Sequence, residues 1–432
     1  MATTTLSTIR FAPYNIGRWL LWGLTALAFI LAPLIFSGGF AITLLSQMGI
    51  MIIFALSYNM IFGQGGMLSF GHAVYSGLGA FFAIHALNWV GDGRLWVPVS
   101  LIPLVGGLFG AVFGVIFGYV TTKKAGTTFA MITLGIGEMV FAASLMFPGF
   151  FGGEGGISSN RVVGEPFLGI NYGPTIQVYY LIAAWCFACM IAMFAFSQTP
   201  LGRISNAVRD NPERAEFIGY NTQRVRFLVV VVSAFFAGIS GGLAAINFEI
   251  VTAENVSALR SGGVLLATFI GGSMVFFGPV IGSIIFIFFA VALSEYTNAW
   301  QFYLGVFFIM MVMFAPGGVA SLILMNLRVI QHKLFGQLLR PYAGVLLASA
   351  LLLLGVIMLV EMSYHMTLNF SAGGRMTLFG IEFEANHWVP WAIALLVTLA
   401  GAAAFDWQRR RFGREWGNVQ AAIEARTLQA RG

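Results

Sequence analysis

The sequence predicts an all-α protein, a polytopic transmembrane helical bundle of about 12 spans. Of the 432 residues, 59% are hydrophobic and only 9% are charged, whereas soluble globular proteins carry about 25% charged residues. The hydrophobic residues fall into runs of about 20, the length that crosses a bilayer as a helix. Glycine occurs 53 times, and small residues allow transmembrane helices to pack closely.

Composition also excludes several classes of function. A chain so poor in charge cannot cover a soluble surface, which excludes a soluble enzyme, a disordered tail protein and a coiled coil. The net charge of +6 would favour nucleic-acid binding only if the basic residues formed one patch. Cys186 and Cys189 share one apolar run, without the acids or histidines of a metal site. We therefore predict no catalytic residue, no metal ligand and no cofactor in this chain.

Each predicted span is an apolar run. The first follows a mixed polar segment, residues 1–18, without a small-residue cleavage site, so we expect a retained span and not a cleaved signal peptide. The eighth and ninth meet at a cluster of glycines and Pro279, so a helical hairpin that does not cross fully is the alternative. The runs are 19–36, 40–61, 72–90, 96–120, 127–147, 177–197, 227–247, 259–276, 278–298, 301–318, 342–362 and 388–405.

Basic residues assign the orientation, because cytoplasmic loops are enriched in lysine and arginine. A cytoplasmic N-terminus and twelve crossings return the C-terminus to the cytoplasm. The outer segments then hold four of the 22 basic residues, namely Arg94, Arg161, Arg260 and Arg375. The inner segments hold the rest: Arg10, Arg18, Lys123, Lys124, Arg203, Arg209, Arg214, Arg224, Arg226, Arg328, Lys333, Arg340, Arg409, Arg410, Arg411, Arg414, Arg426 and Arg431.

A glycine-rich segment interrupts the apolar pattern between Gly63 and His72. Four glycines in nine residues make a poor helix. Irregular backbone inside a membrane is tolerated where it is buried in protein or lines a cavity, and transporters place substrates at such broken helices. Ser69 and His72 are therefore candidate substrate-path residues, and a loop or a closely packed helix junction is the alternative.

Glu138 lies in the middle of the fifth predicted span. A charged side chain at a helix centre costs on the order of 3 kcal/mol on insertion scales, so we expect Glu138 to face a partner or water, or to be protonated. Two interpretations stay open. Glu138 shapes a polar pathway or braces the glycine-rich segment, or it makes a structural hydrogen bond to a neighbouring helix.

The largest predicted inner loop, 198–226, has the pattern of two short helices. Pro200 can start the first, Asp210 or Asn211 can cap the second before Pro212, and Gly219 can end it. Such a pair is suited to a groove on a partner protein. A plain connecting loop is the alternative.

The order of the motifs resembles the LivM/LivH-type permeases of branched-chain amino acid ABC importers, and LivM more closely. Gly63 to Ala73 resembles the family segment G-x-x-G-Q-L-S-x-G-H-A, and Phe-Ala-Met-Ile-Thr-Leu at 129–134 with Glu138 resembles F-A-x-x-T-L…E. The loop 199–219 resembles the ATPase-coupling loop with its E-A-A…G motif. The glycine runs 152–156 and 271–282 and Pro316-Gly317-Gly318 keep the same order over about 40–325.

Three features depart from the family pattern. Met67 stands where the family usually has glutamine, and Arg214 stands where the E-A-A motif has its first alanine. Residues 326–432 extend beyond the usual end and add two spans, an external loop and a basic tail. We expect this extension to pack against the core or to contact a partner subunit.

The resemblance implies an ABC importer permease core with broken helices at 19–325, after cytoplasmic residues 1–18 and before the C-terminal extension 326–432. It implies a multi-pass subunit of the bacterial inner membrane that imports branched-chain or related amino acids and is not itself an enzyme. A second LivH-like permease, two ATPase subunits that use ATP and Mg, and a periplasmic substrate-binding protein would be its partners. Import of urea, amides or aromatic acids is an alternative, as is a stand-alone channel or secondary transporter.

The resemblance also names site residues by position. The expected substrate path comprises Gly63, Gly66, Ser69, Gly71, His72, Thr133 and Glu138. The expected ATPase-coupling loop comprises Gly202, Arg203, Arg209, Asp210, Glu213, Ala215 and Gly219.

Overall fold

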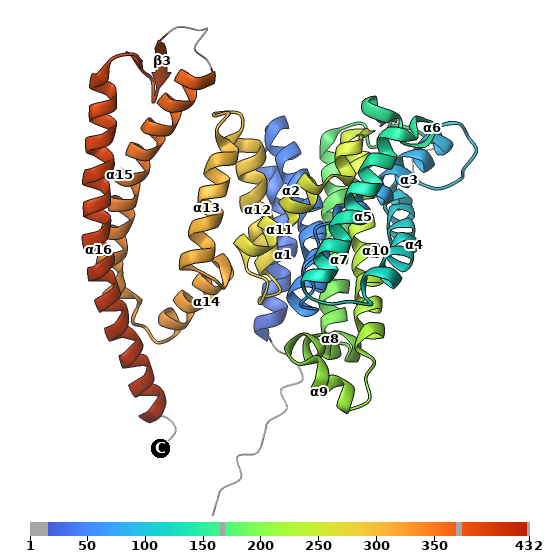
Figure 1. Cartoon of the computed structure of the whole chain (residues 1–432), viewed down its shortest axis with the longest axis horizontal. Coiled ribbons are helices and arrows are strands. Elements are labelled where there is room, and N and C mark those ends of the chain that lie inside the picture. Colours follow the sequence, from blue (N-terminus) through green and yellow to red (C-terminus); the bar gives the residue numbers. More distant parts are fainter. Residues whose placement is uncertain (1–15, 165–168, 369–373, 430–432) are drawn as a thin grey trace, which may run out of the picture. The chain divides into compact units, whose positions relative to one another are not determined.

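A computed structural model describes residues 16–164, 169–368 and 374–429, and these residues are mostly helical (Figure 1). They belong to two compact units, residues 1–292 and 293–432. Of the predicted N-terminal segment 1–18, residues 1–15 lie outside the described residues.

The first unit is a helical bundle with one short antiparallel strand pair. Its helices are α1 (Ile16–Ile35), α2 (Gly39–Asn59), α3 (Ala73–Gly91), α4 (Ile102–Thr121), α5 (Thr127–Met146), α6 (Pro148–Phe151), α7 (Thr175–Gln198), α8 (Pro200–Asp210), α9 (Pro212–Phe217), α10 (Thr222–Phe248), α11 (Ala258–Gly271) and α12 (Gly278–Ile287). The strands are β1 (Ile157–Ser158) and β2 (Ile250–Val251), and π-helical turns follow α2 at Met60–Gln64 and α12 at Phe288–Leu293.

The second unit consists of helices and one β-hairpin. Its helices are α13 (Trp300–Phe314), α14 (Gly318–Gln331), α15 (Phe335–Leu368) and α16 (Trp388–Gln429), and its strands are β3 (Arg375–Leu378) and β4 (Ile381–Glu384). Glycines allow α15 and α16 to pack along each other, since a Cβ at Gly355 would lie 2.8 Å from Cα of Thr398 and one at Gly401 would lie 2.6 Å from Cα of Leu352. The predicted basic tail is helical as far as Gln429, because α16 continues beyond the apolar run 388–405.

Among the described residues, eight helices are long and apolar enough to cross a membrane, and a ninth span results if α13 and α14, bent by 50°, count as one. The apolar parts of α1, α11 and α12 are shorter. Each of the twelve predicted runs contains part of a helix. The multi-pass helical fold is therefore confirmed, whereas the number of twelve crossings stays a prediction.

Glycines line the crossing of α3, α4 and α10 in the first unit. Gly238 in α10 meets Gly79 of α3 and Gly106 of α4, and a Cβ at Gly79 would lie 2.7 Å from Cα of Gly238. Small residues permit such close backbone approach between membrane helices. This crossing fixes α3, and with it the glycine-rich segment that precedes α3.

Candidate functional site

The glycine-rich segment crosses the interior of the first unit as non-helical chain. The π-helical turn at Met60–Gln64 ends the α2 segment, residues 65–72 are irregular, and α3 starts at Ala73. Ser69 and His72 are 1% and 0% exposed. The predicted helix break is therefore present, and all of its residues except Gly66 are buried or partly buried in protein, which is where irregular backbone is tolerated in a membrane.

His72 is the last residue of this segment, directly before α3. Its ring stacks on Phe54 at 5.4 Å between centroids and meets the edges of Tyr58 and Tyr75 at 5.3 and 5.7 Å. Its Nε2 lies 3.0 Å from the hydroxyl of Ser57, which donates its proton to the carbonyl of Phe54 at 2.7 Å. Nε2 must then carry the proton, which leaves Nδ1 of a neutral ring as an acceptor. Nδ1 and the Ser69 hydroxyl are buried without a hydrogen-bond partner among the described residues.

Thr133 holds the segment against α5. Its hydroxyl accepts a hydrogen bond from the N–H of Phe70 at 3.2 Å, and a Cβ at Gly71 would collide with the Thr133 carbonyl. The structure thus brings together Ser69, Gly71, His72 and Thr133 of the predicted substrate path. Glycine is required at residue 71 because the two backbones are in contact.

Arg260 joins this cluster, although the sequence-based orientation counted it with the outer segments. The chain folds back after α10 through a 3₁₀ turn at Ala253–Val256, which packs against Gly77 of α3. The guanidinium group of Arg260 then lies 5.9 Å from the ring centroid of Phe54. Phe54 lies 15 residues after Gly39, the first residue of α2, which is about 22 Å along the helix axis. The ring that Arg260 contacts is therefore far from the N-terminal end of α2. The position of Arg260 inside the apolar run 259–276 is the pattern that could have drawn attention to it.

Gly63 and Gly66 lie apart from His72 and contact the coupling loop instead. A Cβ at Gly66 would lie 2.6 Å from Cγ of Arg209, and the Gly66 φ of +65° favours glycine. The Arg209 guanidinium donates a hydrogen bond to the Gly63 carbonyl and approaches the sulfur of Met274. Arg209 therefore connects α8, the π-helical turn after α2 and the turn between α11 and α12.

Side-chain caps set the geometry of the coupling loop. Thr199 accepts a hydrogen bond from the N–H of Gly202 at the start of α8, and Asn211 accepts one from Arg214 at the start of α9. Gly219, with φ +91°, ends α9, where only glycine is relaxed. The two predicted short helices are confirmed, with Asn211 and not Asp210 as the cap.

The coupling-loop residues divide between the interior and the surface. Gly202 and Ala215 are buried, whereas Arg203, Asp210 and Glu213 are exposed. The tip also exposes two apolar side chains that were not predicted: Phe217 is 89% and Ile218 is 65% exposed. An exposed apolar pair at the end of a helix is suited to insertion into a groove of another protein.

Glu138 faces away from the rest of the unit. Its side chain is exposed on the face of α5 opposite Thr133, and the described residues offer it no hydrogen bond or ion pair. The structure therefore does not contain the predicted hydrogen bond to a neighbouring helix or the predicted brace. A carboxylate exposed at mid-helix is costly in lipid, which favours contact with water or another subunit.

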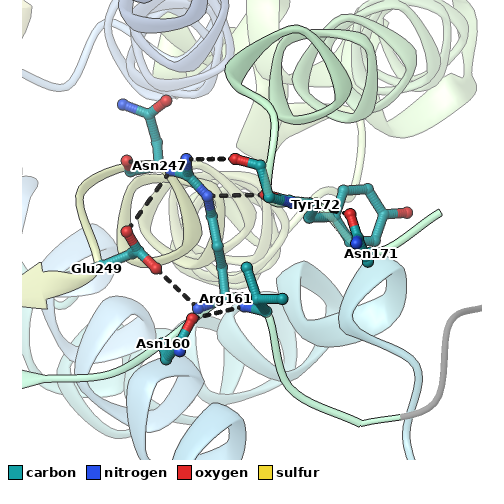
Figure 2. Close-up of polar contacts among 8 residues, drawn as sticks. Asn160, Arg161, Asn171, Tyr172, Asn247 and Glu249 are labelled. Carbon is teal, nitrogen blue, oxygen red and sulfur yellow. Dashed lines mark hydrogen bonds and ion pairs between the residues drawn. The ribbon is translucent and has the colours of Figure 1, made fainter.

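Arg161 connects the chain after β1 to the chain before α7 and to the end of α10 (Figure 2). The guanidinium group of Arg161 donates to the carbonyls of Tyr172, Gly173 and Asn247 at 2.8, 3.2 and 3.3 Å, and lies 3.8 Å from a carboxylate oxygen of Glu249. The Arg161 N–H donates to the other Glu249 oxygen at 2.9 Å. These contacts and the β1–β2 pair hold residues 157–161 and 172–173 on the end of α10.

Comparison with known proteins places most of the first unit in a family. The family described as "Branched-chain amino acid transport system / permease component" matches residues 40–315. The LivM permease protein of the high-affinity branched-chain amino acid transport system of Escherichia coli is 24% identical over 290 residues, which are 62% of this chain and 67% of LivM. The guanosine ABC transporter permease protein NupQ of Bacillus subtilis is 23% identical over 217 residues, which are 48% of this chain and 65% of NupQ. No solved structure matches. The chain therefore belongs to the permease components of branched-chain amino acid transport systems.

Proposed function

We propose that this chain is the transmembrane permease subunit of an ATP-driven ABC importer for branched-chain or related amino acids in the bacterial inner membrane. The family match over residues 40–315 carries the proposal. In this proposal α8 and α9 lie on the cytoplasmic side with both chain termini, and the 157–173 loop lies outside.

The coupling loop provides the attachment for the motor. Two ATPase subunits, which use ATP and Mg, bind the exposed tip of α9 on this chain and on a second, LivH-like permease. Movement of α8 reaches the glycine-rich segment through Arg209, because that side chain binds the Gly63 carbonyl. A periplasmic binding protein delivers the solute to the opposite end. Rigid-body gating of this kind around a fixed interior site is common among transporters.

The exposed carboxylate of Glu138 supports a second permease subunit. In the pair, the Glu138 face of α5 lies at the shared pathway and not in lipid, which avoids the cost of an exposed charge.

Uptake into vesicles tests the proposal. We expect vesicles that contain this chain, a second permease and two ATPases to accumulate leucine only with ATP and the binding protein. An ATPase variant unable to hydrolyse ATP should abolish the uptake. Leucine uptake by this chain alone, driven by an ion gradient, would overturn the importer in favour of a secondary transporter. ATP-driven uptake of urea, an amide, an aromatic acid or guanosine in place of leucine would replace the substrate class.

A further inference from the structure

We infer that Arg260 is the anion-binding residue of the transport path and that the solute it binds carries a carboxylate. This inference rests on the proposed function and adds the residue that recognises the solute.

Within the part of the chain that the structure describes, no carboxylate pairs with the charge of Arg260. Its Nε atom is buried and has no hydrogen-bond partner, and no carboxylate of the described residues lies within ion-pair distance. The Nη1 of Arg260 donates a hydrogen bond to the Asn255 side-chain oxygen at 3.2 Å, and the backbone N–H of Arg260 donates one to the Ser257 hydroxyl. Leaving a buried donor or charge unsatisfied is costly, and charged residues within membrane segments usually mark function.

Arg161 shows what a structural arginine looks like in the same unit. Three carbonyls and Glu249 occupy its guanidinium group. The guanidinium group of Arg260 has one hydrogen bond and the face of Phe54. An arginine fork matches a carboxylate in two parallel hydrogen bonds, so a carboxylate is the ligand that fits its remaining donors.

The surroundings of Arg260 complete a site for a zwitterion. Phe54 contacts the guanidinium group of Arg260 and stacks on His72. His72 Nδ1 and the Ser69 hydroxyl, both buried and unpaired, can accept hydrogen bonds from an ammonium group. The Phe54 ring thus contacts both Arg260, a donor for an anion, and His72, whose Nδ1 is an acceptor for a cation. Urea or a neutral amide would leave the guanidinium charge unpaired, which disfavours them.

Leucine uptake by cells that carry Arg260 variants tests the role of the charge. We expect Arg260→Gln to lower uptake roughly tenfold or more at equal membrane content, as the loss of one charge-assisted hydrogen bond predicts. Arg260→Lys keeps the charge and should retain part of the uptake. Arg161→Gln is the matched control, and we expect it to lower thermal stability more than Arg260→Gln does. Full uptake by stable Arg260→Gln would overturn the inference, while leucine uptake by the wild type would leave the proposed function standing.

Thermal stabilisation of the purified full-length chain tests the ligand class without transport. We expect millimolar leucine to raise the melting temperature of the wild type more than leucinamide, which lacks the carboxylate. This difference should vanish in Arg260→Gln and remain in Arg161→Gln. An equal effect of both compounds on the wild type would overturn the inference. Failure of Arg260→Gln to copurify with the second permease, while the purified variant keeps the leucine response, would also overturn it, because Arg260 would then serve assembly.

Discussion

Arg209 makes the charged contact between the coupling loop and the glycine-rich segment, beside a hydrogen bond that the Ser205 hydroxyl donates to the Gln64 carbonyl at 3.4 Å. Its guanidinium group contacts the Gly63 carbonyl, Met274 and the neighbouring Asp210. We expect Arg209→Gln to lower uptake per ATP hydrolysed roughly tenfold, since a charge-assisted hydrogen bond to the path is lost. Simultaneous assays of uptake and ATP hydrolysis in vesicles measure this ratio.

Lys124, in the turn between α4 and α5, provides the control for Arg209. Its side chain is exposed and lies outside the coupling loop, so Lys124→Gln should leave the coupling ratio within about twofold of the wild type, as for most surface substitutions. An unchanged ratio in Arg209→Gln would show that movement of α8 reaches the interior by another contact.

At the scale of whole helices, the crossing of α3, α4 and α10 depends on glycines, which carry no side chain. We expect Gly238→Ala to destabilise the chain by about 1–3 kcal/mol, because its Cβ would lie 3.0 Å or less from backbone atoms of Gly106 and Gly107. Gly23→Ala in α1 is the control, since a Cβ there meets no atom within 4 Å. Thermal unfolding in detergent should show a loss for Gly238→Ala alone. Equal stability of the two variants would mean that α10 shifts at no cost.

Helix positions could be predicted from the sequence, whereas the ends and bends of several helices could not. An apolar run marks the part of a helix that lipid or core can cover, so it gives α15 as 342–362 although the helix spans 335–368. The run says nothing of the polar turns beyond it, of the β3–β4 hairpin or of the bend between α13 and α14. The glycine-rich segment was found because glycine disfavours helix within a span.

Charge position is a property of the whole molecule, which explains why the count of basic residues did not show that Arg260 lies against Phe54. Counting basic residues assigns each one to a side of the membrane, but the chain after α10 folds back into the bundle and carries Arg260 to Phe54. Glu138 shows the reverse case. Its place at mid-helix was clear from the sequence, yet only the packing of α5 shows that it faces outward.

Cysteine labelling of intact cells tests the predicted orientation of the whole chain. We expect a cysteine at Glu154 to react with a membrane-impermeant maleimide and a cysteine at Arg214 to react only after the cells are opened. Both positions are exposed, and the native Cys186 and Cys189 are buried at 0% and 2%, so the unmodified chain serves as the unlabelled control. Labelling of the Arg214 position in intact cells would reverse the topology.

The Arg161 anchor has a consequence for sequence drift within this family. Arg161 holds its loop through main-chain carbonyls, and every amino acid supplies a carbonyl. The side chains at Tyr172 and Asn247 can therefore change over evolutionary time without loss of these hydrogen bonds. We therefore expect Arg161 and Glu249, whose side chains make these contacts, to tolerate substitution less than Tyr172 and Asn247 do.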